Sequence, residues 1–368
     1  MKKKNLCKTL LKTMCIVLGI LILALLAYIV YLYASYYRIE DNQELVVEAP
    51  VDDTTTGAAA VLATDTEYSA VTYNIGFGAY LPDYSFFMDG GTSSWAESPE
   101  TVQYAINGAG ELVKSLDPDF ALIQEIDLDA TRSYHTDEYE MLRNLLPEYT
   151  TVFAQNYDSA FLFYPFTQPH GSSRAGLGLF SKYPVSSALR RSFPISTSFS
   201  KFFDLDRCYS VSRIPVDNGK ELVIFNLHMS AYGNSDEIRK GQIEMLCNDM
   251  AKEYEAGNYV LCGGDFNHDL KASEEDTESC ESWAFPFPRT ELPEHFAFCL
   301  DLLSSEEQAA LWNSARNADM EYVPGVTYTV TLDGFIISDN IECLSYENVN
   351  TGYSYSDHDP VKVEFMLK

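Results

Sequence analysis

Basic residues are scarce in this sequence. Its 368 residues include 25 lysines and arginines against 54 aspartates and glutamates, so the formal net charge is −29. Residues 1–38 hold six of the basic residues and no acidic one, which leaves the remainder at −29 − 6 = −35. A domain this acidic lacks the basic surface that non-specific binding of nucleic acid requires, and its field attracts cations. Solubility of an exported protein would explain the same charge.

Cysteines are few for a chain of this length, and no two are spaced as C-x-x-C. Cys7 and Cys15 belong to the N-terminal segment, and the other six are Cys208, Cys247, Cys262, Cys280, Cys299 and Cys343. We therefore predict no disulfide framework. A Gly-rich phosphate loop with Lys is missing, which argues against nucleotide-driven phosphoryl transfer. A G-x-S-x-G turn for a serine nucleophile is missing as well.

Long apolar runs are absent except at residues 14–37. About 20 apolar residues span a bilayer as a helix, so we predict a transmembrane helix there. By the positive-inside rule, the basic tail at residues 1–13 lies in the cytoplasm and the rest of the chain lies outside it. A cleaved signal peptide is the alternative, although its apolar stretch is usually shorter. Residues 38–67 are acidic and predict a flexible linker.

Strand-like and helix-like segments alternate through residues 68–368, which we predict to form one layered α/β domain. The clearest strands are the apolar runs at 70–75, 120–126, 221–227 and 259–262. Ser98 followed by Pro99 predicts the start of a helix. Further helices are expected at 136–146 and 304–315.

Six of the apolar strands end in a cluster of Asn, Asp, Glu or His. The clusters are Tyr73-Asn74, Gln124-Glu125, Asn226-Leu227-His228, Gly263-Gly264-Asp265-Phe266-Asn267, Leu332-Asp333-Gly334 and Ser356-Asp357-His358-Asp359. Each alone is typical of an ordinary turn, but together they predict one oxygen-rich site beyond the strand ends. Oxygen ligands suit Mg²⁺, Mn²⁺ or Ca²⁺. A metal with a His and a carboxylate can activate water for attack on a phosphate.

These clusters, in this order, resemble the motifs of the endonuclease/exonuclease/phosphatase family, the DNase I-like fold, over residues 68–368. The resemblance implies a four-layer α/β sandwich, in which two packed mixed β-sheets are flanked by helices. It also implies a metal site formed by Glu125, Asn74 and Asp357, with Mg²⁺ as the expected ion and Mn²⁺ or Ca²⁺ as alternatives.

The same resemblance implies catalytic roles for five more residues. His228 is similar to the His that contacts the scissile phosphate. Asp265 and Asn267 resemble the pair that orients the attacking water and the phosphate. Asp333 resembles the carboxylate that orients His358, which is expected to act as general base or to stabilise the phosphate.

The sequence departs from the family's pattern in two segments and one residue. An aromatic-rich stretch, residues 80–95, precedes Glu125, and residues 268–325 form an unusual insertion. The Arg or Tyr that contacts phosphate in many members has no clear match; Tyr157, Arg174 and Arg213 are candidates. Because such loops surround the site, they leave the substrate open.

We expect metal-dependent hydrolysis of a phosphoester, with a phosphodiester favoured, on the extracytoplasmic side of a membrane. The substrate is a lipid headgroup, a nucleic acid or a small molecule, and no protein partner is inferred. The alternatives are a nuclease acting on extracellular DNA or RNA and an inactive binding module. A complete set of competent residue types favours an active enzyme.

Overall fold

The computed structural model describes residues 2–52, 61–202, 204–231, 236–273 and 284–368, which divide into two units, residues 1–38 and 39–368. The first unit contains one helix, α1 (Lys2–Ser35), whose segment Leu6–Ser35 is long and apolar enough to cross a membrane. The helix starts before the predicted span 14–37, because the lysine-rich segment that precedes the span also favours helix. It ends at Ser35. A signal sequence near the N-terminus can also form a helix that meets this criterion.

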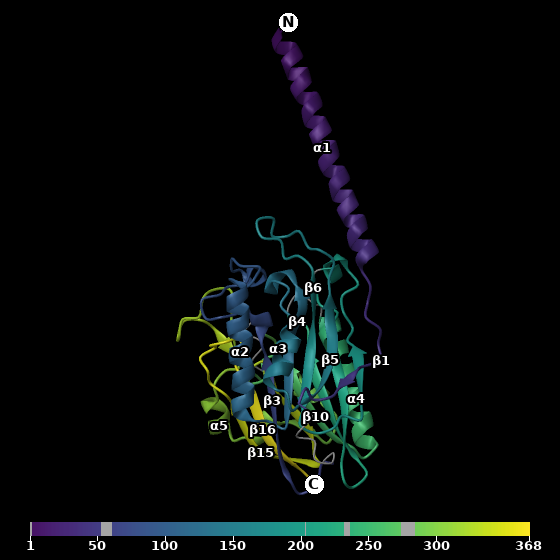
Figure 1. Ribbon diagram of the computed structural model, residues 1–368, viewed down its shortest axis with the longest axis vertical. Coiled ribbons are helices and arrows are strands. Elements are labelled where there is room, and N and C mark those ends of the chain that lie inside the picture. The colour runs from purple at the N-terminus through teal and green to yellow at the C-terminus, as the bar shows by residue number, and fades with distance from the viewer. Residues whose placement is uncertain (1, 53–60, 203, 232–235, 274–283) are drawn as a thin grey trace. The chain divides into compact units, whose positions relative to one another are not determined.

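The second unit contains two seven-stranded sheets (Figure 1). The first has the order β1-β7-β8-β9-β10-β14-β11, and the second has the order β15-β16-β3-β4-β6-β5-β2. β9 and β10 are parallel, as are β3 and β4, whereas the other neighbours are antiparallel. Both sheets are therefore mixed, as the resemblance implied.

The strands of the first sheet are β1 (Gln43–Glu44), β7 (Ser187–Ser192), β8 (Cys208–Pro215), β9 (Glu221–His228), β10 (Tyr259–Asp265), β14 (Asp333–Ser338) and β11 (Phe296–Phe298). Those of the second are β15 (Ile341–Asn348), β16 (Val361–Leu367), β3 (Glu67–Asn74), β4 (Phe120–Ala130), β6 (Ser173–Ser181), β5 (Thr150–Asp158) and β2 (Val47–Glu48). A small hairpin pairs β12 (Ala315–Arg316) with β13 (Thr329–Val330). The longer helices are α2 (Pro99–Leu116), α3 (Glu138–Leu145), α4 (Asp236–Glu255) and α5 (Ser305–Ala310).

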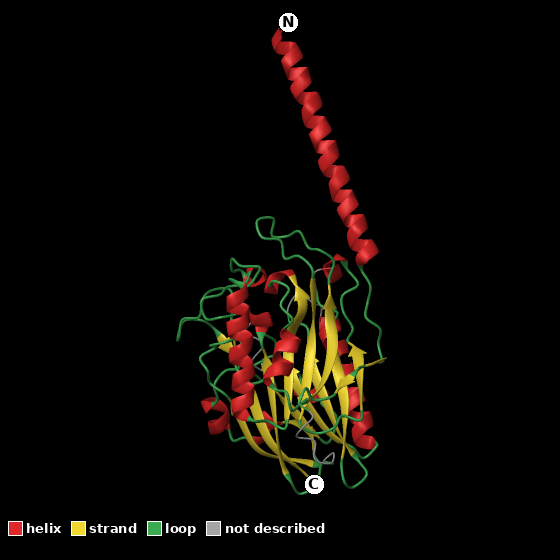
Figure 2. Ribbon diagram, viewed as in Figure 1, coloured by secondary structure: helices red, strands yellow, loops and turns green. Residues whose placement is uncertain are grey.

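The layers are held together by two apolar cores. Leu122 of β4 and Phe225 of β9 belong to one core, in which the two sheets pack face to face. Ile106 of α2, Leu142 of α3 and Ile123 of β4 belong to the second core, which covers the other face of the second sheet (Figure 2). α4 contacts β10 on the remaining face. The four-layer α/β sandwich is therefore confirmed.

Local signals explain why the elements begin and end where they do. The Ser98 side chain accepts a hydrogen bond from the Thr101 N–H and caps α2, as predicted, with Pro at the first helical position. The helix expected at 304–315 ends at Ala310 instead, because Ser314 bonds through its hydroxyl to Asp333 of the sheet.

Within the predicted linker 38–67, residues 43–48 differ from the flexible segment that the composition predicts, and residues 53–60 lie outside the described residues. Gln43 and Glu44 pair with β7, and Val47 and Glu48 pair with β5, so each sheet gains an edge strand from this segment. Backbone pairing along a sheet edge outweighs the polar composition of the segment. Cys280 and part of the expected insertion lie outside the described residues.

Candidate active site

The strand topology brings the six polar clusters to one place. β3 and β4 run parallel, as do β9 and β10, so Asn74, Glu125, His228 and Asp265 lie at the carboxyl-terminal side of their sheets. β14 is antiparallel to β10 in a register that sets Asp333 opposite Asp265. Every predicted site residue thus reaches one region.

Asn74 joins the two sheets. Its Nδ2 donates to Glu125 Oε1 at 3.2 Å and to Asp265 Oδ2 at 3.0 Å, while its Oδ1 accepts from the Gly76 N–H at 3.0 Å. Glu125 has a φ of +57° at an irregularity of the β4–β6 pairing, which turns its side chain out of the regular strand pattern. In this arrangement Asn74 positions two carboxylates, because its oxygen is already engaged by the backbone.

His358 and Asp333 form a buried pair. His358 Nδ1 lies 2.8 Å from Asp333 Oδ2, and the Ser314 hydroxyl donates to the same oxygen at 2.7 Å. Burial by itself would lower the pKa of His358, but the charge and hydrogen bond of Asp333 raise it well above its usual value. The second nitrogen, Nε2, lies 3.8 Å from Asp265 Oδ2. His358 is therefore held as a cation that presents Nε2 to the site.

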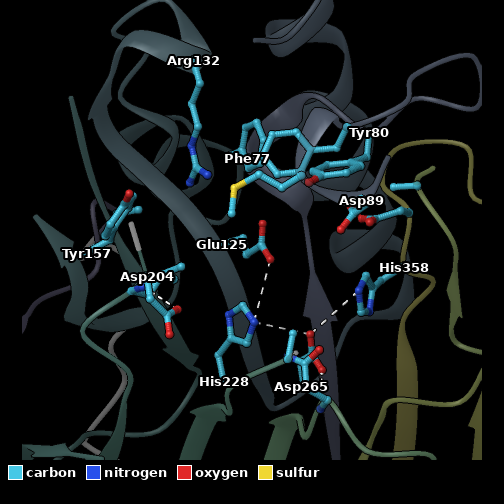
Figure 3. A pocket seen from close by; sticks show the side chains of 18 of the residues that line it. Phe77, Tyr80, Asp89, Glu125, Arg132, Tyr157, Asp204, His228, Asp265 and His358 are labelled. Atoms are coloured by element: carbon cyan, nitrogen blue, oxygen red, sulfur yellow. Dashed lines mark hydrogen bonds and ion pairs between the residues drawn. The ribbon is translucent and has the colours of Figure 1, made fainter. Parts of the chain in front are cut away.

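Asp265 also faces the second histidine. His228 Nε2 lies 3.6 Å from Asp265 Oδ2 and 3.8 Å from Glu125 Oε1 (Figure 3). Burial raises the pKa of Asp265 to about 7 and lowers the pKa of His228 well below its usual value. Asn267, with a φ of +50°, donates its N–H to Asp265 Oδ1 at 2.8 Å and its Nδ2 to the Met229 carbonyl at 2.9 Å. The carboxylate thus has a fixed orientation.

The acidic residues fit a divalent cation. Burial and then the charge of Asp357 raise the pKa of Glu125, and burial raises the pKa of Asp357. Two half-buried carboxylates that repel each other are stabilised by a hard cation with oxygen ligands. Asp265, Asp333 and His358 also lie close enough to share an ion. The hydrogen bond between Asp333 and His358 competes with that arrangement, so we favour Glu125 and Asp357.

A cavity of about 790 Å³ opens at these residues. Of the predicted site residues, those that line it are Glu125, His228, Asp265, Asn267, Asp357 and His358. Asn74 and Asp333 are buried behind this surface. The wall beyond them includes Tyr80, Phe86 and Phe87, from the aromatic stretch 80–95, and Phe77, which precedes it. Asp89 and Arg132 lie beside these rings (Figure 3). The cavity thus has a polar, catalytic end and a wall in which aromatic rings and charged groups are mixed.

Three arginines that the motifs did not predict also line the cavity. Arg132 pairs with Asp127 and lies 3.7 Å over the ring of Phe77. Arg316 donates to the carbonyls of Tyr80 and Leu81.

Arg207 is the third, and its buried Nη1 has no hydrogen-bond partner within the described residues. Arg207 directly precedes β8, and β8 starts beside the end of its neighbour β9 at His228. This position at a strand end is the signal by which the sequence could have indicated it. Such a nitrogen at a cavity wall suits a phosphate oxygen.

The three residues that the sequence offered for contacting phosphate lie in different places. Tyr157 lines the cavity. Arg174 instead pairs with Asp129 at the surface, and Arg213 pairs with Glu221 and Glu253. Neither of these arginines is among the residues that line the cavity.

Carboxylates and histidines gathered at the strand ends of two packed sheets are the groups that hydrolysis of a phosphoester requires. The chain belongs to the Endonuclease/Exonuclease/phosphatase family, whose model matches residues 71–302. Members of this family are phosphoesterases or nucleases, which supports hydrolysis of a phosphoester by this chain.

Solved structures share the fold at low sequence identity. An endonuclease/exonuclease/phosphatase from Beutenbergia cavernae is 16% identical with a TM-score of 0.54, over 82% of this chain and 72% of that one. One from Bacteroides vulgatus is 17% identical with a TM-score of 0.53, over 83% and 100%. TDP2 from D. rerio, complexed with a single-strand DNA product, is 14% identical with a TM-score of 0.54, over 82% and 99%. No curated protein matches the chain.

Proposed function

We propose that this chain hydrolyses a phosphodiester with the help of a divalent cation, on the extracytoplasmic side of a membrane. The observation that carries the proposal is the arrangement of Asp265 between His228 and His358 at the polar end of the cavity, with Glu125 and Asp357 beside them. Water supplies a hydroxyl to phosphorus, one P–O ester bond breaks, and a proton passes to the departing oxygen. The products are a phosphomonoester and an alcohol.

Glu125 and Asp357 would hold the cation, with Mg²⁺ expected and Mn²⁺ or Ca²⁺ as alternatives. When bound, the cation polarises a phosphoryl oxygen and offsets negative charge in the transition state. Asn74 keeps Glu125 in place through its amide. The predicted role of Asn74 thus shifts from ligand to positioning residue.

The remaining groups divide the proton transfers between them. Asp265, whose pKa is raised to about 7 by burial, is suited to accept a proton from water near neutral pH. His358 is cationic beside Asp333, so of its two expected roles we favour stabilising the phosphate over acting as general base. His228 contacts the phosphate as a neutral donor, and Asn267 holds Asp265 for the attacking water.

A diester is favoured over a monoester by the shape of the cavity. The aromatic part of its wall, which includes Phe77, Phe86 and Phe87, continues past the catalytic groups. That space accommodates a second substituent on phosphorus, which a monoester lacks.

The proposed location rests on the N-terminal helix. Its segment Leu6–Ser35 can span a bilayer, and lysines flank its N-terminal side only. Protease added to intact cells should therefore remove the domain, and complete protection would contradict an external site.

The test of activity uses the full chain in detergent with bis(4-nitrophenyl) phosphate as a soluble diester. Hydrolysis should need Mg²⁺, Mn²⁺ or Ca²⁺ and should stop on chelation. Glu125→Gln and His358→Asn should each lower kcat by at least about 100-fold. The surface variant Glu111→Gln serves as the control. Wild-type rates in both site variants would overturn the proposal.

A further inference from the structure

The chain between the N-terminal helix and the domain is short. α1 ends at Ser35, and Ile39 already belongs to the domain, where its N–H donates to Asp206 Oδ2 at 2.7 Å. The buried guanidinium of Arg190 donates to the carbonyls of Ile39 and Glu40. Four residue steps reach at most about 14 Å. If α1 spans the bilayer, chain length alone keeps Ile39 close to the membrane surface.

This attachment point is next to the cavity. Asp206, which holds Ile39, lies within the segment 204–207, and Asp204, Leu205 and Arg207 of that segment line the cavity. The wall that contains Arg207 is thus joined directly to the residues that follow the helix. A tether this short favours a substrate that is itself in the membrane.

The loop between β5 and β6, residues 159–172, carries large aromatic side chains that face solvent. Phe166 is 85% exposed and Tyr164 61%, and Phe163 is exposed as well. Tyr164 also lines the cavity and packs against Phe87, with ring centroids 5.8 Å apart. The loop lies at the end of the sheet toward which β4 runs, as Figure 1 shows. Aromatic rings of this kind favour the interface between a bilayer and water.

We propose that the substrate is a membrane phospholipid, whose headgroup phosphodiester enters the cavity while loop 159–172 contacts the bilayer. The inference rests on the proposed function and names its substrate class. The volume, about 790 Å³, suits a headgroup. The aromatic part of the wall suits the glycerol and the first acyl carbons. A net charge of −29 − 6 = −35 outside residues 1–38 opposes a polyanionic nucleic acid.

Bilayer contact can be measured without activity. The full chain, reconstituted in phosphatidylcholine vesicles, is compared as Phe166→Trp and as Leu302→Trp. Leu302 is 56% exposed beside β11, at the opposite edge of its sheet from β1. Brominated phosphatidylcholine should quench the added fluorescence of Phe166→Trp and leave that of Leu302→Trp unchanged. Equal quenching, or none in either variant, would overturn bilayer contact by the loop.

Substrate class is tested in vesicles of phosphatidylcholine and phosphatidylglycerol by the release of phosphorus-containing headgroups. Phe163→Ser/Phe166→Ser should lose at least about ten-fold on vesicle lipid and keep the wild-type rate on bis(4-nitrophenyl) phosphate, whereas Leu302→Ser should keep both. Wild-type lipid turnover by the double variant would overturn the inference. The inference would also be overturned if the wild-type chain hydrolysed the soluble diester or single-stranded DNA but hydrolysed no vesicle lipid. If the wild-type chain hydrolysed none of these substrates, the result would contradict the proposed function instead.

Discussion

The pair between Arg132 and Asp127 makes a sharp test of the structure, because both side chains are buried. Asp127 accepts from Arg132 Nε at 3.1 Å, from Arg132 Nη2 at 2.8 Å and from the Ser133 hydroxyl at 2.8 Å. Arg132→Ala removes two of these donors and leaves a carboxylate with no exposed surface. It also removes the contact of the guanidinium with Phe77.

The expected loss in the free energy of unfolding is about 3–5 kcal/mol, the usual cost of breaking a buried ion pair. The lost cation–π contact adds about 1 kcal/mol. Urea denaturation of the full chain in detergent, followed by tryptophan fluorescence, measures this directly, since Trp95 and Trp312 lie in the domain. The m value should stay unchanged, which would show that the substitution changes stability and not the surface exposed on unfolding.

The matched control is Arg174→Ala. Arg174 and its partner Asp129 are 51% and 46% exposed, so the loss should be about 0–1 kcal/mol. Asp127→Asn in the Arg132→Ala background should recover part of the stability, because it removes the uncompensated charge. Equal losses in Arg132→Ala and Arg174→Ala would refute the reasoning.

Three further predictions concern the site and its wall. Asp333→Asn should lower the pKa of His358, because its hydrogen bond to a charged group is lost. A pH–rate profile should then show kcat reduced by about 10–100-fold above neutral pH. An unchanged profile would contradict the pairing of Asp333 with His358. Cation binding should protect the fold, so Mg²⁺ should raise Tm in the wild type and not in Glu125→Gln/Asp357→Asn; an equal shift in both would place the cation elsewhere. Burial lowers the pKa of His170 to about 3, so only the unfolded state takes up its proton between about pH 6.5 and 3. The contribution of His170 to stability is therefore complete above about pH 6.5, falls by up to about 1.4 kcal/mol per pH unit as the pH drops through that range, and levels off below about pH 3. His170→Gln should flatten this fall in acid denaturation, and an identical slope would rule out a buried neutral His170.

The sequence was sufficient to predict the class of fold, and the residues predicted for the site lie together in the structure. Apolar runs that end in polar residues identify strands whose ends meet, whatever their order in the sheet. Asn74 and His228 are examples, since each is the last residue of its strand, whereas Glu125 lies inside β4, which continues to Ala130. The pattern does not predict the register in which neighbouring strands pair. That Asp333 lies opposite Asp265 depends on an antiparallel pairing between segments 68 residues apart, since 333 − 265 = 68.

Other parts of the site had no periodic signal. Arg132 and Arg316 come from a short turn and a two-residue strand, and each is buried by contacts with distant segments. The acidic composition of residues 38–67 predicts solvation, yet β1 and β2 pair with sheet edges. In both cases tertiary hydrogen bonds outweigh local preference, which a single sequence does not report.

The charge distribution connects the proposed cofactor, substrate and membrane location. The domain is acidic overall, but at about 0.15 M salt its field is screened within about 8 Å. At that range a phosphate in the cavity meets Arg132, Arg207 and Arg316 rather than the outer surface. A long polyanion would have to cover acidic surface as well, whereas one headgroup would not. The acidic exterior therefore favours cations and single phosphates, and raising the salt should speed hydrolysis of single-stranded DNA more than hydrolysis of a vesicle lipid. The opposite order would show that the arginines belong to a wider basic surface.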